Sequence, residues 1–164
     1  MCLRQCIWVA VVVQSIAVLF TLIALASPNW GASTNGGIYK GLFHTCVSVS
    51  GRCYDTYQYF DASNEKGSLI AAAVLEIFTL VGMVLVLILM IFYLCGLFEE
   101  ISVGRAAVAT AFVAAVLGLT GVIVYGVTMV SISYRLDWSF ALAVVGILFD
   151  IAAGIAMWIG LEQS

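Results

Sequence analysis

Four long runs of apolar residues set the strongest limit on what this chain can fold into. No charged side chain occurs between residues 7 and 26, and three further runs contain very few charges. An α-helix needs roughly 20 apolar residues to cross the hydrocarbon core of a bilayer. We therefore predict an all-α membrane protein, a four-helix transmembrane bundle with spans at about 7–26, 68–98, 106–130 and 139–161.

The composition supports this interpretation and excludes several functions. Of the 164 residues, 64% are hydrophobic and 9% are charged, whereas a soluble domain is about half apolar and about a quarter charged. The net charge is −3 and the Lys and Arg residues are scattered, so we expect no nucleic-acid binding. Four spans leave no room for a catalytic domain, and His44 is the only histidine. Because the common enzyme motifs are also absent, we expect neither an enzyme nor a cofactor.

The first run ends at a helix-breaking sequence. Pro28 stops a helix, and Trp30 has the amphipathic ring that favours a membrane interface. A cleaved signal peptide is the alternative interpretation of an N-terminal apolar run, but this run is long for one and Ser27-Pro28 is a poor cleavage context. With four spans both termini lie on the same side, and the other side holds a large loop at about 27–67 and a short loop at about 131–138.

The five cysteines separate into two groups. Cys46 and Cys53 fall in the large loop, whereas Cys2, Cys6 and Cys95 fall at the opposite face of the membrane. Only an oxidising compartment would keep a loop disulfide, so we place both loops outside the cell and both termini in the cytoplasm. The count of Lys and Arg is larger on the loop side and would by itself favour the reverse orientation. The three inner cysteines are candidates for S-palmitoylation, with plain thiols as the alternative.

The large loop has the residue pattern of β-strands. Residues 37–49 are rich in β-branched and aromatic types, Ser50-Gly51 is a turn signal, and 52–59 is typical of a returning strand. A bridge between Cys46 and Cys53 would hold this hairpin in register and stabilise it by about 2 kcal/mol. Two free thiols are the alternative. We therefore expect a small extracellular antiparallel sheet in the first loop.

A motif in the same loop points to one family of membrane proteins. Its six residues are Trp30, Gly41, Leu42, Phe43, Cys46 and Cys53. They resemble the W…GLW…C…C signature of the claudin superfamily, which comprises claudins, peripheral myelin protein, epithelial membrane proteins, lens intrinsic membrane protein and calcium-channel gamma subunits. Phe43 replaces the usual Trp, and the intervals are short. The whole chain is thus similar to a single claudin-like tetraspan domain, as a short invertebrate-like or divergent member.

The resemblance carries implications for structure and function. It implies that Trp30 and the Gly41–Phe43 segment anchor the sheet on the helices; the alternative is that Trp30 is simply an interface aromatic. It implies a plasma-membrane protein at cell–cell contacts that associates with itself or related claudin-like proteins, laterally and across the gap, as a paracellular barrier or channel. An auxiliary, gamma-type subunit of a channel or receptor is the second hypothesis. The tail lacks the apolar C-terminal residue that a PDZ scaffold binds, so direct PDZ binding is not expected.

Two carboxyl groups and one amide lie within the predicted spans: Glu76, Asp150 and Gln14. A charged carboxylate at mid-span costs several kcal/mol, so each must be protonated, partnered or in contact with water. Gly146 and Gly154 share a helix face with Asp150, which favours a buried hydrogen bond between helices. An ion or proton pathway through Glu76 and Asp150 is the alternative, and contact with a cofactor, lipid or partner is another. Candidate partners of Asp150 are Gln14, Thr120 and Tyr125.

The third span carries a stripe of small residues at helical spacing. Its members are Ala107, Ala111, Ala114, Ala115, Gly118 and Gly121. Helices in lipid associate through such close backbone contacts. We expect the stripe to pack inside the bundle, with a dimer seam as the alternative.

An aromatic cluster follows the second loop cysteine. It consists of Tyr54, Tyr57, Tyr59 and Phe60, with Asp55 among them. Tyrosine supplies large contact area at low entropic cost, so we interpret the cluster as a partner surface. Asp55 lies near the place where channel-forming claudins carry pore-lining charge. Because the charges of residues 31–67 cancel, no strong ion-selecting field is expected.

Overall fold

Our computed structural model describes residues 2–34, 37–59, 63–96, 101–131 and 133–162. Four helices are long and apolar enough to cross a membrane: α1 (Cys2–Ala26), α3 (Ser63–Leu94), α4 (Ile101–Ser131) and α5 (Trp138–Glu162). Their outward faces carry large apolar side chains such as Phe78 and Val127, as expected where lipid is the solvent. The chain is therefore a multi-pass membrane protein by length and composition of its helices.

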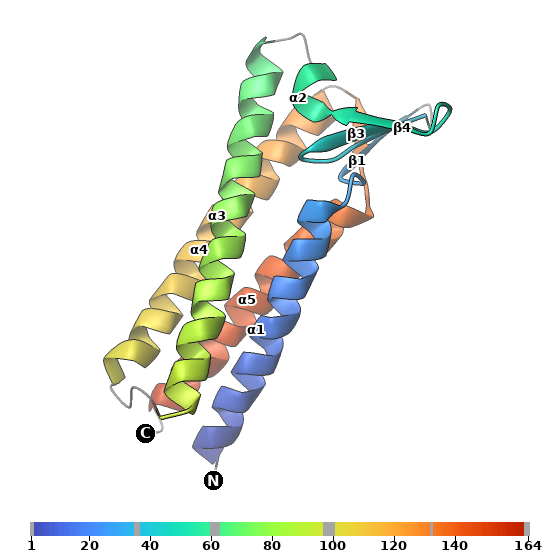
Figure 1. The fold of residues 1–164 in the computed structure, drawn as a ribbon. Coiled ribbons are helices and arrows are strands. Elements are labelled where there is room, and N and C mark those ends of the chain that lie inside the picture. The colour runs from blue at the N-terminus through green and yellow to red at the C-terminus, as the bar shows by residue number, and fades with distance from the viewer. Residues whose placement is uncertain (1, 35–36, 60–62, 97–100, 132, 163–164) are drawn as a thin grey trace.

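The four helices form two closely packed pairs. α1 packs along α5 and α3 packs along α4, while α4 and α5 join the two pairs. Figure 1 shows both pairs running side by side from the ends that carry the chain termini to the end that carries the sheet. All six small residues predicted as a stripe on α4 are buried. The stripe therefore packs inside the bundle, where small side chains let helix backbones approach closely.

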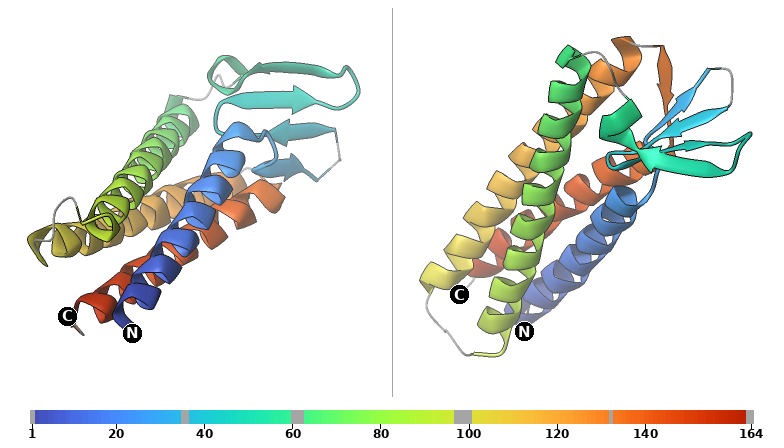
Figure 2. Two further views of the ribbon diagram at one scale, coloured as in Figure 1. Left: turned by 60° about the horizontal axis from the view of Figure 1, so that its bottom comes forward. Right: turned by 45° about the horizontal axis from the view of Figure 1, so that its top comes forward.

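A five-stranded antiparallel sheet lies at one end of the bundle. Its strands are β1 (Gly31–Ser33), β2 (Ile38–Lys40), β3 (His44–Val47), β4 (Arg52–Asp55) and β5 (Tyr134–Leu136), in the order β4-β3-β2-β1-β5. In both views of Figure 2 the sheet extends sideways, beyond the helices. The β3–β4 hairpin is consequently the part of the sheet farthest from the second loop.

The sheet includes a strand that the sequence did not predict. β5 comes from the second loop and pairs with β1, with Gly31 opposite Leu136 and Ala32 opposite Arg135. The predicted antiparallel sheet in the first loop is therefore present, and the second loop adds a fifth strand that the prediction lacked. Three residues are too few for strand periodicity to be recognised, and β5 forms because β1 offers it an open edge.

The predicted hairpin strands are also shorter than expected. The strand predicted at 37–49 is two strands, β2 and β3, with a sharp bend at residues 41–43 between them. The strand predicted at 52–59 ends at Asp55 and is followed by a short helix, α2 (Thr56–Tyr59). Asp55 Oδ1 accepts the Tyr57 backbone N–H at 3.0 Å, a helix-capping contact that ends the strand.

The helices extend beyond the predicted spans. α1 begins at Cys2, and α3 already begins at Ser63. The third span was predicted to begin at about 106, but α4 begins at Ile101 and Arg105 lies within its first turns. Hydropathy marks only the part of a helix that lies in hydrocarbon, whereas backbone hydrogen bonding continues into the interface.

Replacing Gly146 by alanine should loosen the α1–α5 pair. A Cβ at Gly146 would lie 2.6 Å from Thr21 Oγ1 and 3.3 Å from the backbone oxygen of Ala17. We expect Gly146→Ala to lower the free energy of unfolding by about 1–3 kcal/mol, measured by denaturation in detergent. The control is Gly67→Ala, because a Cβ at this helical glycine meets nothing within 4 Å. Equal losses in both variants would contradict the packing argument.

Candidate functional site

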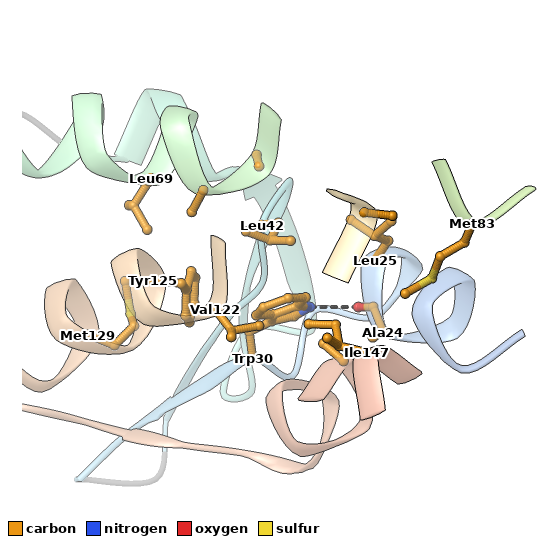
Figure 3. Close-up of a cluster of buried hydrophobic side chains, with 14 of the residues drawn as sticks. Ala24, Leu25, Trp30, Leu42, Leu69, Met83, Val122, Tyr125, Met129 and Ile147 are labelled. Atoms are coloured by element: carbon orange, nitrogen blue, oxygen red, sulfur yellow. Dashed lines mark hydrogen bonds between the residues drawn. The ribbon is translucent and has the colours of Figure 1, made fainter. Parts of the chain in front are cut away.

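Trp30 joins the first loop to the helix bundle. Its ring is fully buried, and its Nε1–H donates to the Ala24 carbonyl in the last turn of α1 at 2.6 Å, the contact drawn as a dashed line in Figure 3. The ring also packs edge-to-face against Tyr125 and Phe140, with centroids 5.1 Å and 6.1 Å away. Trp30 is therefore placed as an anchor between α1, α4 and α5, and not as an exposed interface ring.

Lys40 is a second junction, and the sequence did not single it out. Its backbone carbonyl accepts both the Trp30 N–H at 3.1 Å and the Tyr125 hydroxyl at 2.9 Å. Its side chain is buried, and Nζ lies 4.1 Å from the centre of the Tyr134 ring, a cation–π contact. Lys40 thus joins β2 to β1, α4 and β5. A single lysine in a polar loop gives no sequence signal for such a role.

Close packing against the backbone explains why a glycine occupies position 41 of the motif. A Cβ at Gly41 would lie 2.7 Å from Pro28 Cα and 2.9 Å from the Ser27 carbonyl. The next residue, Leu42, is buried in the same cluster as Trp30, and Phe43 packs against that cluster. The Gly41–Phe43 bend therefore packs directly against the backbone that follows α1.

Two buried threonines hold the base of the β3–β4 hairpin. The hydroxyls of Thr45 and Thr56 lie 3.1 Å apart, and the Thr56 hydroxyl also donates to the Gly41 carbonyl at 3.3 Å. The Thr56 backbone N–H donates to the Phe43 carbonyl at 3.0 Å. The bend, the hairpin and the start of α2 consequently form one hydrogen-bonded unit on top of the bundle.

A disulfide holds the outer half of the hairpin. Cys46 and Cys53 lie opposite each other in the β3–β4 register and are bonded, which confirms the predicted bridge. Beyond them the chain turns through Gly51 at a φ of +63°, a conformation that glycine adopts readily. Val49 at this tip is 93% exposed. The disulfide thus presents an apolar side chain to water at the end of a constrained hairpin.

The predicted aromatic surface is only partly present. Tyr54 is 44% exposed and Asp55 is exposed. Tyr57 instead packs against the buried cluster, and burial together with the Asp55 carboxylate raises the pKa of its phenol, which is therefore neutral near pH 7. The side chain of Tyr59 and the whole of Phe60 lie outside the described residues. Among the described side chains of this cluster, Tyr54 and Asp55 are the exposed ones.

A polar contact links three helices inside the membrane. Gln14 Nε2 donates to Asp150 Oδ1 at 2.7 Å and to the Met83 carbonyl at 3.1 Å. Gln14 was one of the predicted partners of Asp150. The other two were wrong, because Thr120 is exposed and bonds within its own helix, while Tyr125 bonds to the sheet.

Glu76 lies at a different helix contact. It is fully buried, and its Oε1 lies 2.8 Å from the position that a Cβ on Gly121 of α4 would take. Among the described residues, neither carboxyl oxygen of Glu76 has a hydrogen-bond partner. Asp150 is held between α1, α3 and α5, so the structure does not bring the two carboxyls together in one site.

The remaining predicted site residues lie at the end away from the sheet. Cys95 is exposed and Cys6 is partly buried, while the side chain of Cys2 lies outside the described residues. Acylation of these cysteines stays a prediction. Within the described ranges, no three His, Cys, Asp or Glu side chains gather in a way that could hold a metal ion.

Comparisons with known proteins give no relative. No protein-family model matches the chain, and the search of curated proteins finds no match. The claudin resemblance accordingly depends on the motif residues in the first loop.

Substitution of Gly41 tests how tightly the sheet is seated. We expect Gly41→Ala to destabilise the protein by about 1–3 kcal/mol, because the new methyl group meets backbone atoms that cannot rotate away. Gly37→Ala is the matched control on the other side of β2, where a Cβ meets nothing within 4 Å. Thermal unfolding in detergent measures both. Indistinguishable thermal-unfolding midpoints for the two variants would mean that the bend does not pack closely against Pro28.

A double-mutant cycle tests the contact between Gln14 and Asp150. We expect Gln14→Leu to lower stability by about 1–3 kcal/mol, because it leaves a buried carboxyl without its donor. Asp150→Leu should also lower stability, because the Gln14 amide then keeps only its hydrogen bond to the Met83 carbonyl. The double variant should be less destabilised than the sum of the single variants. Strict additivity of the unfolding free energies would show that the two side chains do not interact.

Proposed function

We propose that this protein is a claudin-like adhesion protein of cell–cell junctions in the plasma membrane, with the sheet outside the cell and both termini in the cytoplasm. The motif resemblance supports this proposal. The Cys46–Cys53 disulfide supports the orientation, because such bridges persist in oxidising compartments.

The observation that carries the proposal is the constrained, exposed hairpin tip. Val49 is almost fully exposed at the end of a disulfide-bonded hairpin, and the hairpin base is fixed to the bundle through Trp30 and Gly41. Removing an exposed apolar side chain from water is favourable, and this would drive the binding of a partner. A rigid support reduces the conformational entropy lost when that group binds a partner. A second membrane across a narrow gap would offer such a partner.

Lateral association would use the outer edge of the sheet. β4 is the edge strand opposite β5, and all four of its residues are exposed. An edge strand presents unpaired backbone groups that can pair with another chain. Pairing of the β4 edge with the β5 edge of a neighbouring copy would repeat head to tail and place many tips in a row, which is the arrangement needed for a barrier between cells.

Cell-mixing experiments test this proposal. Two differently labelled populations of non-adherent cells that express the protein should aggregate and concentrate it at their contacts. Val49→Ser should reduce aggregation because it removes the apolar group, whereas Val49→Ile should preserve it because the tip stays apolar. Val49 is 93% exposed, so both variants should fold normally.

Two outcomes would contradict the junction proposal. One is the absence of enrichment at cell contacts with the unmodified protein. The other is recovery of a channel or receptor subunit in fixed stoichiometry when the protein is purified in mild detergent from its native cells. That result would instead support the role of an auxiliary subunit.

A further inference from the structure

A cavity of about 510 Å³ opens between α4 and α5 at the end of the bundle away from the sheet. Ligand pockets in proteins span roughly 300–1,000 Å³, so its size suits a substantial ligand. Its walls include Val108, Phe112 and Trp158, together with the charged residues Arg105 and Glu162. Trp158 is 51% exposed there, as is typical of tryptophan at a membrane interface.

The polar end of the cavity offers one charge of each sign. Glu162 Oε1 accepts the Trp158 indole N–H at 2.7 Å, which leaves its second oxygen available to a ligand. Arg105 supplies planar N–H donors that suit a phosphate. In the part of the chain that the structure describes, Arg105 and Glu162 form no ion pair with each other. A ligand with both a phosphate and an ammonium group would satisfy both side chains.

A second hollow lies farther along α4, toward the middle of the membrane. Phe112 also lines this hollow of about 270 Å³ with Val116 and Leu117. At 1.5 Å per residue, α4 covers about 16 Å between Arg105 and Val116. This matches the roughly 15 Å depth of half a hydrocarbon core. We call the cavity and the second hollow together the groove. The groove has the length of one leaflet, and it is apolar where acyl chains lie.

We infer that this groove binds a phospholipid with a zwitterionic, primary-amine headgroup of the phosphatidylethanolamine class. Arg105 would bind the phosphate, Glu162 the ammonium group, and the surfaces around Phe112 and Val116 one acyl chain. The paired charges favour this headgroup over a sterol, which has only a hydroxyl. A second copy packed through the same face would pair Arg105 with Glu162 across the contact, so lipid-free dimers are the competing outcome of the test. The inference is independent of the junction proposal.

Native mass spectrometry of the full chain in detergent tests this site. Phosphatidylethanolamine, phosphatidylcholine and phosphatidylserine with identical acyl chains are added at equal concentration. We expect phosphatidylethanolamine to bind best. Arg105→Gln should weaken its binding about tenfold because a charge-assisted contact is lost. The matched control is Arg135→Gln, which removes an exposed arginine at the sheet end. It should leave phosphatidylethanolamine binding unchanged.

Glu162→Gln tests the headgroup preference. Glutamine still accepts the Trp158 N–H but cannot pair with an ammonium group, so the preference over phosphatidylcholine should disappear while phosphatidylcholine binding persists. Equal binding of all three lipids to the unmodified protein and to Arg105→Gln would overturn the site. A preference for phosphatidylserine would overturn the inference that the headgroup is zwitterionic. Lipid-free dimers would overturn a lipid as the occupant. Circular dichroism checks that each variant is folded.

Discussion

The burial of Trp30 between the ends of the helices is the contact on which the sheet depends. Strands of three or four residues cannot form a stable sheet in water by themselves. Trp30 supplies a large buried ring and directs its N–H to the Ala24 carbonyl, while the Lys40 carbonyl accepts from both Trp30 and Tyr125. The sheet therefore obtains much of its stability from the bundle beneath it.

The bundle is held together by different means, because lipid provides no hydrophobic driving force between helices. Close approach of small residues, such as Gly146 against Thr21, supplies packing. The Gln14–Asp150 contact adds a directional bond between α1 and α5. A bundle fixed in this way holds the height and direction of the β3–β4 hairpin relative to the helices, which the proposed adhesion function requires.

Much of the fold could be predicted from the sequence, but the contents of the loops could not. Continuous apolar runs mark spans because the bilayer sets their length, and two cysteines across a turn indicate a bridge. The bend at Gly41 and the strand β5 were missed, because each exists only through a neighbour distant in the chain. In the sequence Lys40 looks like an ordinary solvated lysine, and only the fold places its ammonium group over the Tyr134 ring.

The sequence by itself determined the four helices, the disulfide-bonded hairpin and the need for a polar partner at Asp150, since these follow from local pattern and from the cost of burying charge in lipid. Only the tertiary structure decided which partner Asp150 takes, that the second loop completes the sheet, and that Arg105 and Glu162 line one cavity. These features join segments far apart in the chain, and their geometry depends on how the helices pack, which residue spacing alone does not specify.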